Sequence, residues 1–168
     1  MNLSIRFYSG CLFLIKFHMK NIRKATVQDV SQLAELFDQY RVFYHKNSDI
    51  PAAEKFLKER IENNDSEIFV AESDDKLVGF VQLYPLFSST RMKRYWLLND
   101  LFVNENYRGN GFSKELIEEA KQLAKSTDAC GVLLETGKSN DIGNKLYPSC
   151  GFEIYDEVNF YEWTNKDL

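Results

Sequence analysis

An arginine and two glycines stand close together in the stretch NENYRGNGFSKE, from Asn104 to Glu115. Gly109 and Gly111 allow a backbone to curl so that its N–H groups approach an anion without a Cβ clash. A helical pattern begins directly after them, and the N-terminus of a helix attracts negative charge. Arg108 adds a charged group that can bind phosphate. The stretch therefore predicts a phosphate loop, although a tight turn alone accounts for the glycines equally well.

Two familiar phosphate loops do not fit this stretch. A P-loop needs the pattern GxxxxGK[ST], which the chain lacks. A dinucleotide fingerprint needs a third glycine three residues after Gly111, where the chain has Lys114. The kind of phosphate must therefore be inferred from the elements around the loop.

Hydrophobic spacing predicts the elements that position the loop. Thr26 followed by Asp29 is an acidic variant of a capping box and predicts a helix start. Apolar residues at helical spacing and apolar alternation predict the remaining elements. The predicted helices cover 26–44, 51–63, 112–126 and 140–150, and the predicted strands cover 22–26, 67–73, 77–85, 95–103 and 131–136, with the last strands in 151–163. This order implies one mixed α/β domain over 19–168.

Composition and charge narrow the function. The chain has 168 residues, 44% of them hydrophobic and 27% charged, as in an ordinary globular protein. A net charge of −4 argues against a nucleic-acid partner and mildly favours a cationic one. The three cysteines are odd in number, widely spaced and form no CxxC pair near a histidine, so we expect no metal site and no disulfide framework. This cysteine usage indicates a reducing, cytoplasmic setting.

Residues 1–18 differ from the rest of the chain. Their apolar run CLFLIKF is short, is interrupted by Lys16 and has no cleavage site after it. It is far too short to span a membrane, so no membrane partner is expected. Met19 stands directly before the first domain-like residues. We therefore interpret 1–18 as an N-terminal extension outside the fold.

Two motifs together resemble the GNAT superfamily of acetyl-CoA-dependent N-acetyltransferases. The first is the loop, which matches the family pattern [QR]-x-x-G-x-[GA] at Arg108, Gly109, Asn110, Gly111 and Phe112, with Ser113 in place of the final Gly or Ala. The second is NDIGNKLYPSCGF, which resembles N-x-x-A-x-x-[LF]-Y followed by a Gly-Phe pair. The resemblance covers Asn21 to about Trp163.

The resemblance implies a fold and a cosubstrate. The GNAT fold has a central mixed, mostly antiparallel twisted sheet flanked by about four helices. Its pyrophosphate loop corresponds here to 108–113, and the cosubstrate is acetyl-CoA, with no metal. The backbone of Leu101, Phe102 and Val103 would meet the pantetheine arm beside a bulge in that strand, and Asn140 would bond the arm or cap the following helix.

Tyr147 is the residue that the resemblance places beside the cosubstrate sulfur. Its phenol has an ordinary pKa of about 10, above the value of about 8.5 for a thiol, so it can protonate a departing thiolate. The alternative is an aromatic anchor for a short helix, and the match of the surrounding motif favours the catalytic role. Pro148 and Gly143 both disfavour helix, so we expect the segment around Tyr147 to be short and loosely held.

The general base is open at this stage. Asn99 and Asp100 interrupt the apolar strand at 95–103, and simple alternation places them on opposite faces. Polyamine acetyltransferases, which look similar here, have a glutamate at the position of Asn99. Because asparagine cannot accept a proton, Asp100, Glu135 or a water relay remain, and Asp100 fits a buried structural carboxylate equally well.

Three functions are consistent with these residues. The first is acetyl transfer to a primary amine of a small molecule, such as a polyamine or amino acid, bound near Tyr40, Tyr44 and Trp96. The second is acetylation of protein lysines or N-termini. The third is an acyl-CoA-binding sensor without turnover. Many members of the family are dimers, so a homodimer is one option.

Overall fold

The computed structural model describes residues 20–167, so the predicted extension at 1–18 lies outside the described residues. A five-stranded sheet in the order β1-β2-β3-β4-β5 forms its centre. The strands are β1 (Lys20–Lys24), β2 (Glu67–Ser73), β3 (Lys76–Ser88), β4 (Lys93–Val103) and β5 (Val132–Leu134). The helices are α1 (Val30–Phe43), α2 (Ile50–Glu62), α3 (Phe112–Ser126) and α4 (Asp141–Ser149), with short 3-10 turns at Val27–Asp29 and Glu105–Tyr107.

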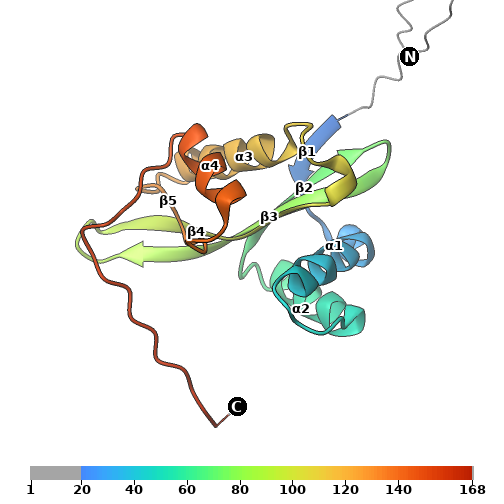
Figure 1. Cartoon of the computed structure of the whole chain (residues 1–168), viewed down its shortest axis with the longest axis horizontal. Helices are drawn as coiled ribbons and strands as arrows, with labels where there is room; N and C mark the ends of the chain where they lie inside the picture. The colour runs from blue at the N-terminus through green and yellow to red at the C-terminus, as the bar shows by residue number, and fades with distance from the viewer. Residues whose placement is uncertain (1–19, 168) are drawn as a thin grey trace, which may run out of the picture.

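The sheet is mixed and mostly antiparallel, which confirms the predicted fold class. Strands β1 to β4 pair antiparallel in sequence order, whereas β5 runs parallel to β4. Helices α3 and α4 lie on one side of the sheet, and α1 and α2 lie on the other (Figure 1). The connection from β4 through α3 to β5 is the crossover that a parallel pair requires.

Two hydrophobic cores hold these layers together. One lies under α3, where Phe112, Leu116 and Ile117 pack against the sheet with at most 3% exposure. The other lies under α1 and α2, where Leu33, Leu57 and Phe80 are completely buried. A chain of aromatic contacts then runs outward from Phe80 to Tyr40, whose ring centroids are 6.0 Å apart.

A charged cluster fixes the start of α1. The Asp29 carboxylate accepts hydrogen bonds from the Thr26 backbone N–H and hydroxyl, as the acidic capping pattern predicts. Arg23 forks across Asp29 and Glu72 at 2.7 and 2.9 Å. These contacts hold the pKa of Asp29 at about 2, with the Arg23 hydrogen bond as the largest cause. The cluster joins β1 and β2 to the helical layer.

The C-terminal segment corrects one prediction. The predicted strands within 151–163 are absent, and the segment runs away from the sheet as irregular chain (Figure 1). Its large apolar side chains are exposed, including Tyr161 at 90% and Trp163 at 84%. A strand needs a neighbouring backbone to pair with, and the adjacent edge strand β5 offers only three residues.

Candidate active site

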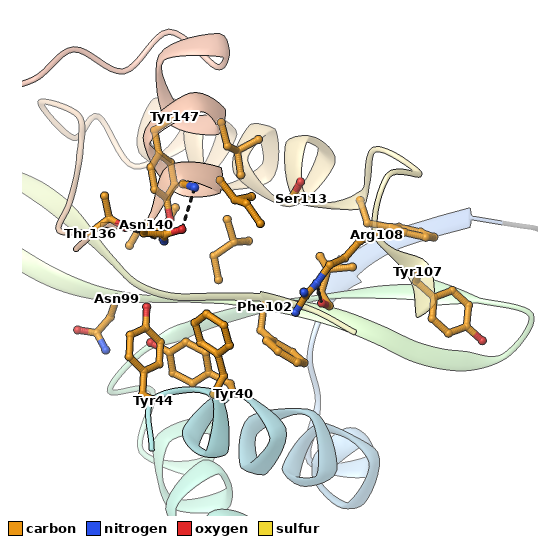
Figure 2. Close-up of a pocket in the computed structure, with 18 of the residues that line it drawn as sticks. Tyr40, Tyr44, Asn99, Phe102, Tyr107, Arg108, Ser113, Thr136, Asn140 and Tyr147 are labelled. Atoms are coloured by element: carbon orange, nitrogen blue, oxygen red, sulfur yellow. Dashed lines mark hydrogen bonds between the residues drawn. The ribbon is translucent and has the colours of Figure 1, made fainter. Parts of the chain in front are cut away.

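One pocket gathers most of the residues that the sequence singled out. It lies between the C-terminal end of α1 on one side of the sheet and α3 and α4 on the other, with β4 between them (Figure 2). Its lining comprises Tyr40, Phe43, Tyr44, Leu98, Asn99, Leu101, Phe102, Val103, Tyr107, Arg108, Gly109, Gly111, Phe112, Ser113, Glu135, Thr136, Asn140, Ile142, Gly143, Leu146 and Tyr147.

A bulge in β4 shapes the floor of the pocket. Gln82 pairs with Asp100 and Leu83 pairs with Leu98, so Asn99 is the extra residue. The bulge brings the two polar side chains to the same place, because the Asn99 amide donates to the Asp100 carboxylate at 3.1 Å. The prediction that Asn99 and Asp100 point to opposite faces is therefore wrong. Simple alternation fails where a strand carries an additional residue.

The second half of β4 has an open edge. Strand β5 pairs with β4 only from Trp96 to Leu98. The edge of β4 from Asn99 to Val103 therefore has no strand partner on that side among residues 20–167. Leu101, Phe102 and Val103 line the pocket along this edge. Backbone groups that point away from β3 are open to a ligand there, except the Val103 carbonyl, which accepts from Arg108.

The glycine loop has the left-handed backbone that its sequence predicts. Gly109 has φ 76° and Gly111 has φ 88°, values that side-chain-bearing residues rarely adopt. Arg108 donates from Nε to the Val103 carbonyl at 3.0 Å, which ties the loop to the end of β4. Asn110 turns its amide back onto the Tyr107 and Arg108 carbonyls. Of residues 108–113, all but Asn110 line the pocket.

Asp100 lies beneath the pocket and is not part of its lining. The residue is 6% exposed, and this burial raises the pKa of its carboxyl group. Hydrogen bonds with Asn99 and Tyr40 partly offset the rise. Tyr40 does line the pocket, and its own pKa is raised by burial and by the nearby Asp100 charge. Tyr40 thus connects the open pocket with the buried carboxylate.

A second buried polar group accompanies Asp100 on the adjacent strand. Gln82, its register partner on β3, is completely buried. The Gln82 amide nitrogen donates to the Ser66 and Tyr84 hydroxyls at 2.8 and 3.1 Å. Its oxygen has no hydrogen-bond partner among the described residues. Since an unpaired buried acceptor is costly, Gln82 offers a place for a donor beside Asp100.

Tyr147 faces the pocket from α4, opposite Tyr44 at the C-terminal end of α1 (Figure 2). Burial raises the pKa of its phenol, and the nearby Tyr44 adds to the rise. Its ring packs edge-on against Phe152 with centroids 5.9 Å apart. The helix continues through Tyr147 and Pro148, and Gly151, at φ 82°, ends it in the left-handed conformation. The segment around Tyr147 is therefore helical up to Ser149, and Pro148 does not end the helix before it.

Asn140 caps the start of α4. Its side-chain oxygen accepts from the Gly143 backbone N–H at 3.0 Å, and its amide donates to Thr136 at 3.0 Å (Figure 2). A Cβ at Gly143 would lie 2.7 Å from the Asn140 amide nitrogen, so a side chain here would shift the cap. Both Asn140 and Thr136 line the pocket, so the cap and the pocket wall are the same residues.

Two of the three residues named for the acceptor region line the pocket. Tyr40 and Tyr44 line the pocket, with ring centroids 5.0 Å apart. Trp96 does not, because its side chain is 3% exposed within the core under α3 and its indole N–H donates to Thr127. Phe43 lines the pocket and is 58% exposed. Its place in the apolar spacing of α1 predicts a buried residue instead.

Two features are absent from residues 20–167. No group of three or more His, Cys, Asp or Glu side chains that could hold a metal ion occurs there. None of the helices in that range is long and apolar enough to cross a membrane.

A family model and two relatives show which class of protein the chain belongs to. The model of the acetyltransferase (GNAT) family matches residues 31–152, so the chain belongs to this family. Its members use acetyl-CoA as cosubstrate. A relative from Bacillus subtilis (strain 168), the uncharacterized N-acetyltransferase YhfO, is 44% identical over 133 residues, covering 79% of this chain and 89% of that protein. A probable acetyltransferase from Haemophilus influenzae is 29% identical over 83% of this chain and 94% of its own length.

Solved structures agree with this assignment. The crystal structure of a probable acetyltransferase superposes with a TM-score of 0.84 at 38% identity, covering 88% of this chain and 99% of that chain. An aminoglycoside acetyltransferase from an uncultured soil metagenomic sample, in complex with sisomicin, superposes with a TM-score of 0.74 at 26% identity. That match covers 88% of this chain and 97% of the other.

Proposed function

We propose that this N-acetyltransferase moves the acetyl group of acetyl-CoA to a primary amine of a small molecule in a ternary complex, in the cytoplasm. The observation that carries the proposal is that one pocket has the glycine loop and Tyr147 on one side and aromatic residues at the end of α1 on the other. A small-molecule acceptor is further supported by the likeness to an aminoglycoside acetyltransferase in complex with sisomicin.

The cosubstrate would occupy the side of the pocket formed by β4, the loop and α3. Backbone N–H groups at Gly109, Gly111 and the start of α3 suit the pyrophosphate, because the first turn of a helix has unpaired donors and positive partial charge. Small Ser113 leaves room for close approach. The open edge from Leu101 to Val103 suits the amides of the pantetheine arm, with Asn140 facing it across the pocket.

The reaction joins the amine nitrogen to the thioester carbonyl carbon. The acceptor must first lose a proton, because an alkylammonium has a pKa of about 10.4. Its lone pair then attacks the carbonyl, and the tetrahedral intermediate collapses by breaking the carbon–sulfur bond. The products are the amide and CoA, whose thiolate takes up a proton.

Asp100 is our choice for the final proton acceptor. It does not line the pocket, so the proton would pass through the Tyr40 hydroxyl, which gives its own proton to Asp100 and takes one from the ammonium. The raised pKa of Asp100 favours this transfer, since a carboxylate penalised by burial is a stronger base. The unpartnered oxygen of Gln82 would accept a hydrogen bond from the protonated acid. Exposed Glu135 on the pocket lining is the alternative base.

Tyr147 is our choice for the acid that protonates the thiolate. Its pKa is raised above the ordinary phenol value, so it keeps its proton at neutral pH and remains able to donate. The packed ring of Phe152 and the capped end of α4 fix its direction.

A thiol-release assay tests the proposal. The purified protein is incubated with acetyl-CoA and, in separate reactions, with polyamines, amino acids, aminoglycosides and lysine-containing peptides. We expect CoA release that depends on a small amine, with mass spectrometry identifying its acetylated form. Turnover of peptides alone would indicate a protein acetyltransferase. Binding of acetyl-CoA without turnover on any acceptor would indicate a sensor.

A further inference from the structure

Lys20 lies at the glycine loop although 90 residues separate it from Asn110. It begins β1, and its ammonium group donates a hydrogen bond to the Asn110 backbone carbonyl. The same nitrogen is 3.3 Å from Glu115 Oε1 and 4.8 Å from the centre of the Phe112 ring. The Lys20 ammonium group, from a strand distant in sequence, therefore contacts Asn110 of the loop and both Phe112 and Glu115 at the start of α3.

The position of this cation is electrostatically unusual. The N-terminus of a helix carries positive partial charge, so a lysine beside the first turn of α3 is disfavoured unless an anion compensates it. Glu115 is the neighbouring carboxylate, but its distance of 3.3 Å exceeds the 2.7 to 2.9 Å that charge-assisted bonds prefer. Both side chains are more than a third exposed, at 37% and 43%. Their ion pair alone gives little reason to place a lysine there.

The hydrogen bond to Asn110 gives a better reason. In a trans peptide the carbonyl and the following N–H point in opposite directions. Because the Asn110 carbonyl is directed at Lys20, the Gly111 N–H is directed away from it. Gly111 lines the pocket, whereas Lys20 does not. A cation on the carbonyl also polarises the peptide and strengthens its N–H as a donor.

We propose that Lys20 is a positioning residue of the phosphate loop, which orients and polarises the Asn110–Gly111 peptide toward the pyrophosphate of acetyl-CoA. The inference rests on the proposed function, because it needs the loop to bind the cosubstrate phosphates. Lys20 acts from behind the loop and does not touch the ligand. Glu115 keeps the ammonium group in place but is not needed for the peptide contact.

Two ligands that differ in their phosphates test the proposal. Acetyl-CoA carries the pyrophosphate, and S-acetylpantetheine lacks it. In calorimetric titrations of the full chain, we expect Lys20→Met to weaken acetyl-CoA about ten-fold, the scale of one charge-assisted hydrogen bond. Its affinity for S-acetylpantetheine should equal that of the wild type. Lys20→Arg, which keeps a donor and a charge, should restore most of the acetyl-CoA affinity.

Two matched variants separate positioning from other roles. Lys114→Met removes a positive charge from an exposed side chain in the first turn of α3. The Asn110 carbonyl accepts from Lys20 and not from Lys114. The variant should therefore keep its affinity for acetyl-CoA within about two-fold of the wild type. Glu115→Gln breaks the ion pair but keeps the Lys20 contact, so acetyl-CoA should bind at least as well as in the wild type. An equal loss in Glu115→Gln and Lys20→Met would overturn the proposal in favour of a simple ion-pair tether.

The remaining outcomes are also decisive. Unchanged acetyl-CoA affinity in Lys20→Met, with wild-type protein binding normally, overturns the role of Lys20 and leaves the proposed function intact. Equal weakening of both ligands overturns it as well, because a general structural defect would not distinguish them. Failure of the wild type to bind acetyl-CoA is a different result, which refutes the proposed function itself.

Discussion

The two sides of the pocket are built in different ways. The side formed by β4, the glycine loop and α3 rests directly on a core in which Phe112, Leu116 and Ile117 are at most 3% exposed. The opposite rim consists of side chains that extend into solvent, with Phe43 and Tyr44 58% and 50% exposed. Changes to these buried residues on the first side disturb the packing of the sheet. Side chains on the rim can change without that cost, which fits a scaffold that keeps one cosubstrate and varies its acceptor.

The largest expected effect is on the packed side, at Gly111. Its φ of 88° disfavours any side chain, and a Cβ would lie 3.6 Å from Glu115 Oε1. Gly111→Glu adds backbone strain and a negative charge that repels the pyrophosphate. Acetyl-CoA binding should therefore be abolished in calorimetric titration. Gly109→Ala is the matched control: its Cβ meets nothing within 4 Å, so only backbone strain remains and the loss should be about ten-fold. Normal binding by a folded Gly111→Glu protein would refute the phosphate loop.

Asp100 should give the next largest effect, on turnover rather than binding. Asp100→Asn removes the proposed proton acceptor, so kcat at neutral pH should fall by about a hundred-fold or more while acetyl-CoA affinity stays constant. Tyr40→Phe should lower kcat similarly, because it interrupts the same path. Full turnover in Asp100→Asn would transfer the role of base to Glu135 or water.

Asp100→Asn, which should lower turnover, should preserve or increase the stability of the fold. The folded-state pKa of Asp100 is raised above its unfolded value of about 3.9, so ionisation disfavours the folded state. This cost is absent below the unfolded pKa and is complete above the folded one. Thermal melts should therefore show Asp100→Asn at least as stable as the wild type at pH 7. The difference should shrink as the pH falls toward 4, and a variant that loses stability at every pH would contradict the assignment.

Tyr147→Phe should reduce turnover by roughly ten- to a thousand-fold, the range expected for loss of one proton donor. Acetyl-CoA affinity and the melting temperature should hardly change, because the ring still packs against Phe152. The wild-type rate should fall at high pH as the phenol ionises, and this limb should move in the variant. Unchanged turnover on the preferred amine would mean that water protonates the thiolate.

The smallest effect should be on the exposed rim. Tyr44→Ala removes an aromatic face but no core contact, so the melting temperature and acetyl-CoA affinity should stay near wild type. The KM for the amine should rise about two- to five-fold, as expected for one exposed cation–aromatic contact. Phe87→Ala, at an aromatic residue 75% exposed outside the pocket, is the control and should change neither quantity. A large drop in Tm for Tyr44→Ala would remove the distinction between the two sides.

Local sequence determined what could be predicted on the packed side. Gly109 and Gly111 predict a left-handed backbone, and the spacing of apolar residues in α3 predicts which face of the helix is buried. Local sequence does not predict the role of Lys20, because its contact with Asn110 joins segments 90 residues apart. Trp96 was misplaced because an aromatic residue fits a core and a binding site equally well. Only the packing of α3 against the sheet distinguishes the two.

The exposed parts were harder to predict for a different reason. The alternation of apolar and polar residues in 151–163 predicts strands. Alternation shows that a segment can form a strand, but it does not show whether a neighbouring strand is available to pair with it. With three residues in β5, the sheet supplies little backbone for a further strand. Phe43 similarly continues the apolar spacing of α1 beyond the last turn that the sheet covers.

The extra residue at Asn99 has a consequence for anyone who redesigns this enzyme. Trp96, Leu98, Asp100 and Phe102 all have even numbers, yet Trp96 and Leu98 belong to the core under α3, whereas Phe102 belongs to the core under α1. If β4 were a regular strand with Asn99 in its pairing, these four side chains would form a single row, and Asp100 and Phe102 would point into the space that α3 fills. A library that randomises β4 at every second position would therefore mix the interior of one layer with the interior of the other. Substitutions should be grouped by their side of Asn99, and not by odd and even numbers.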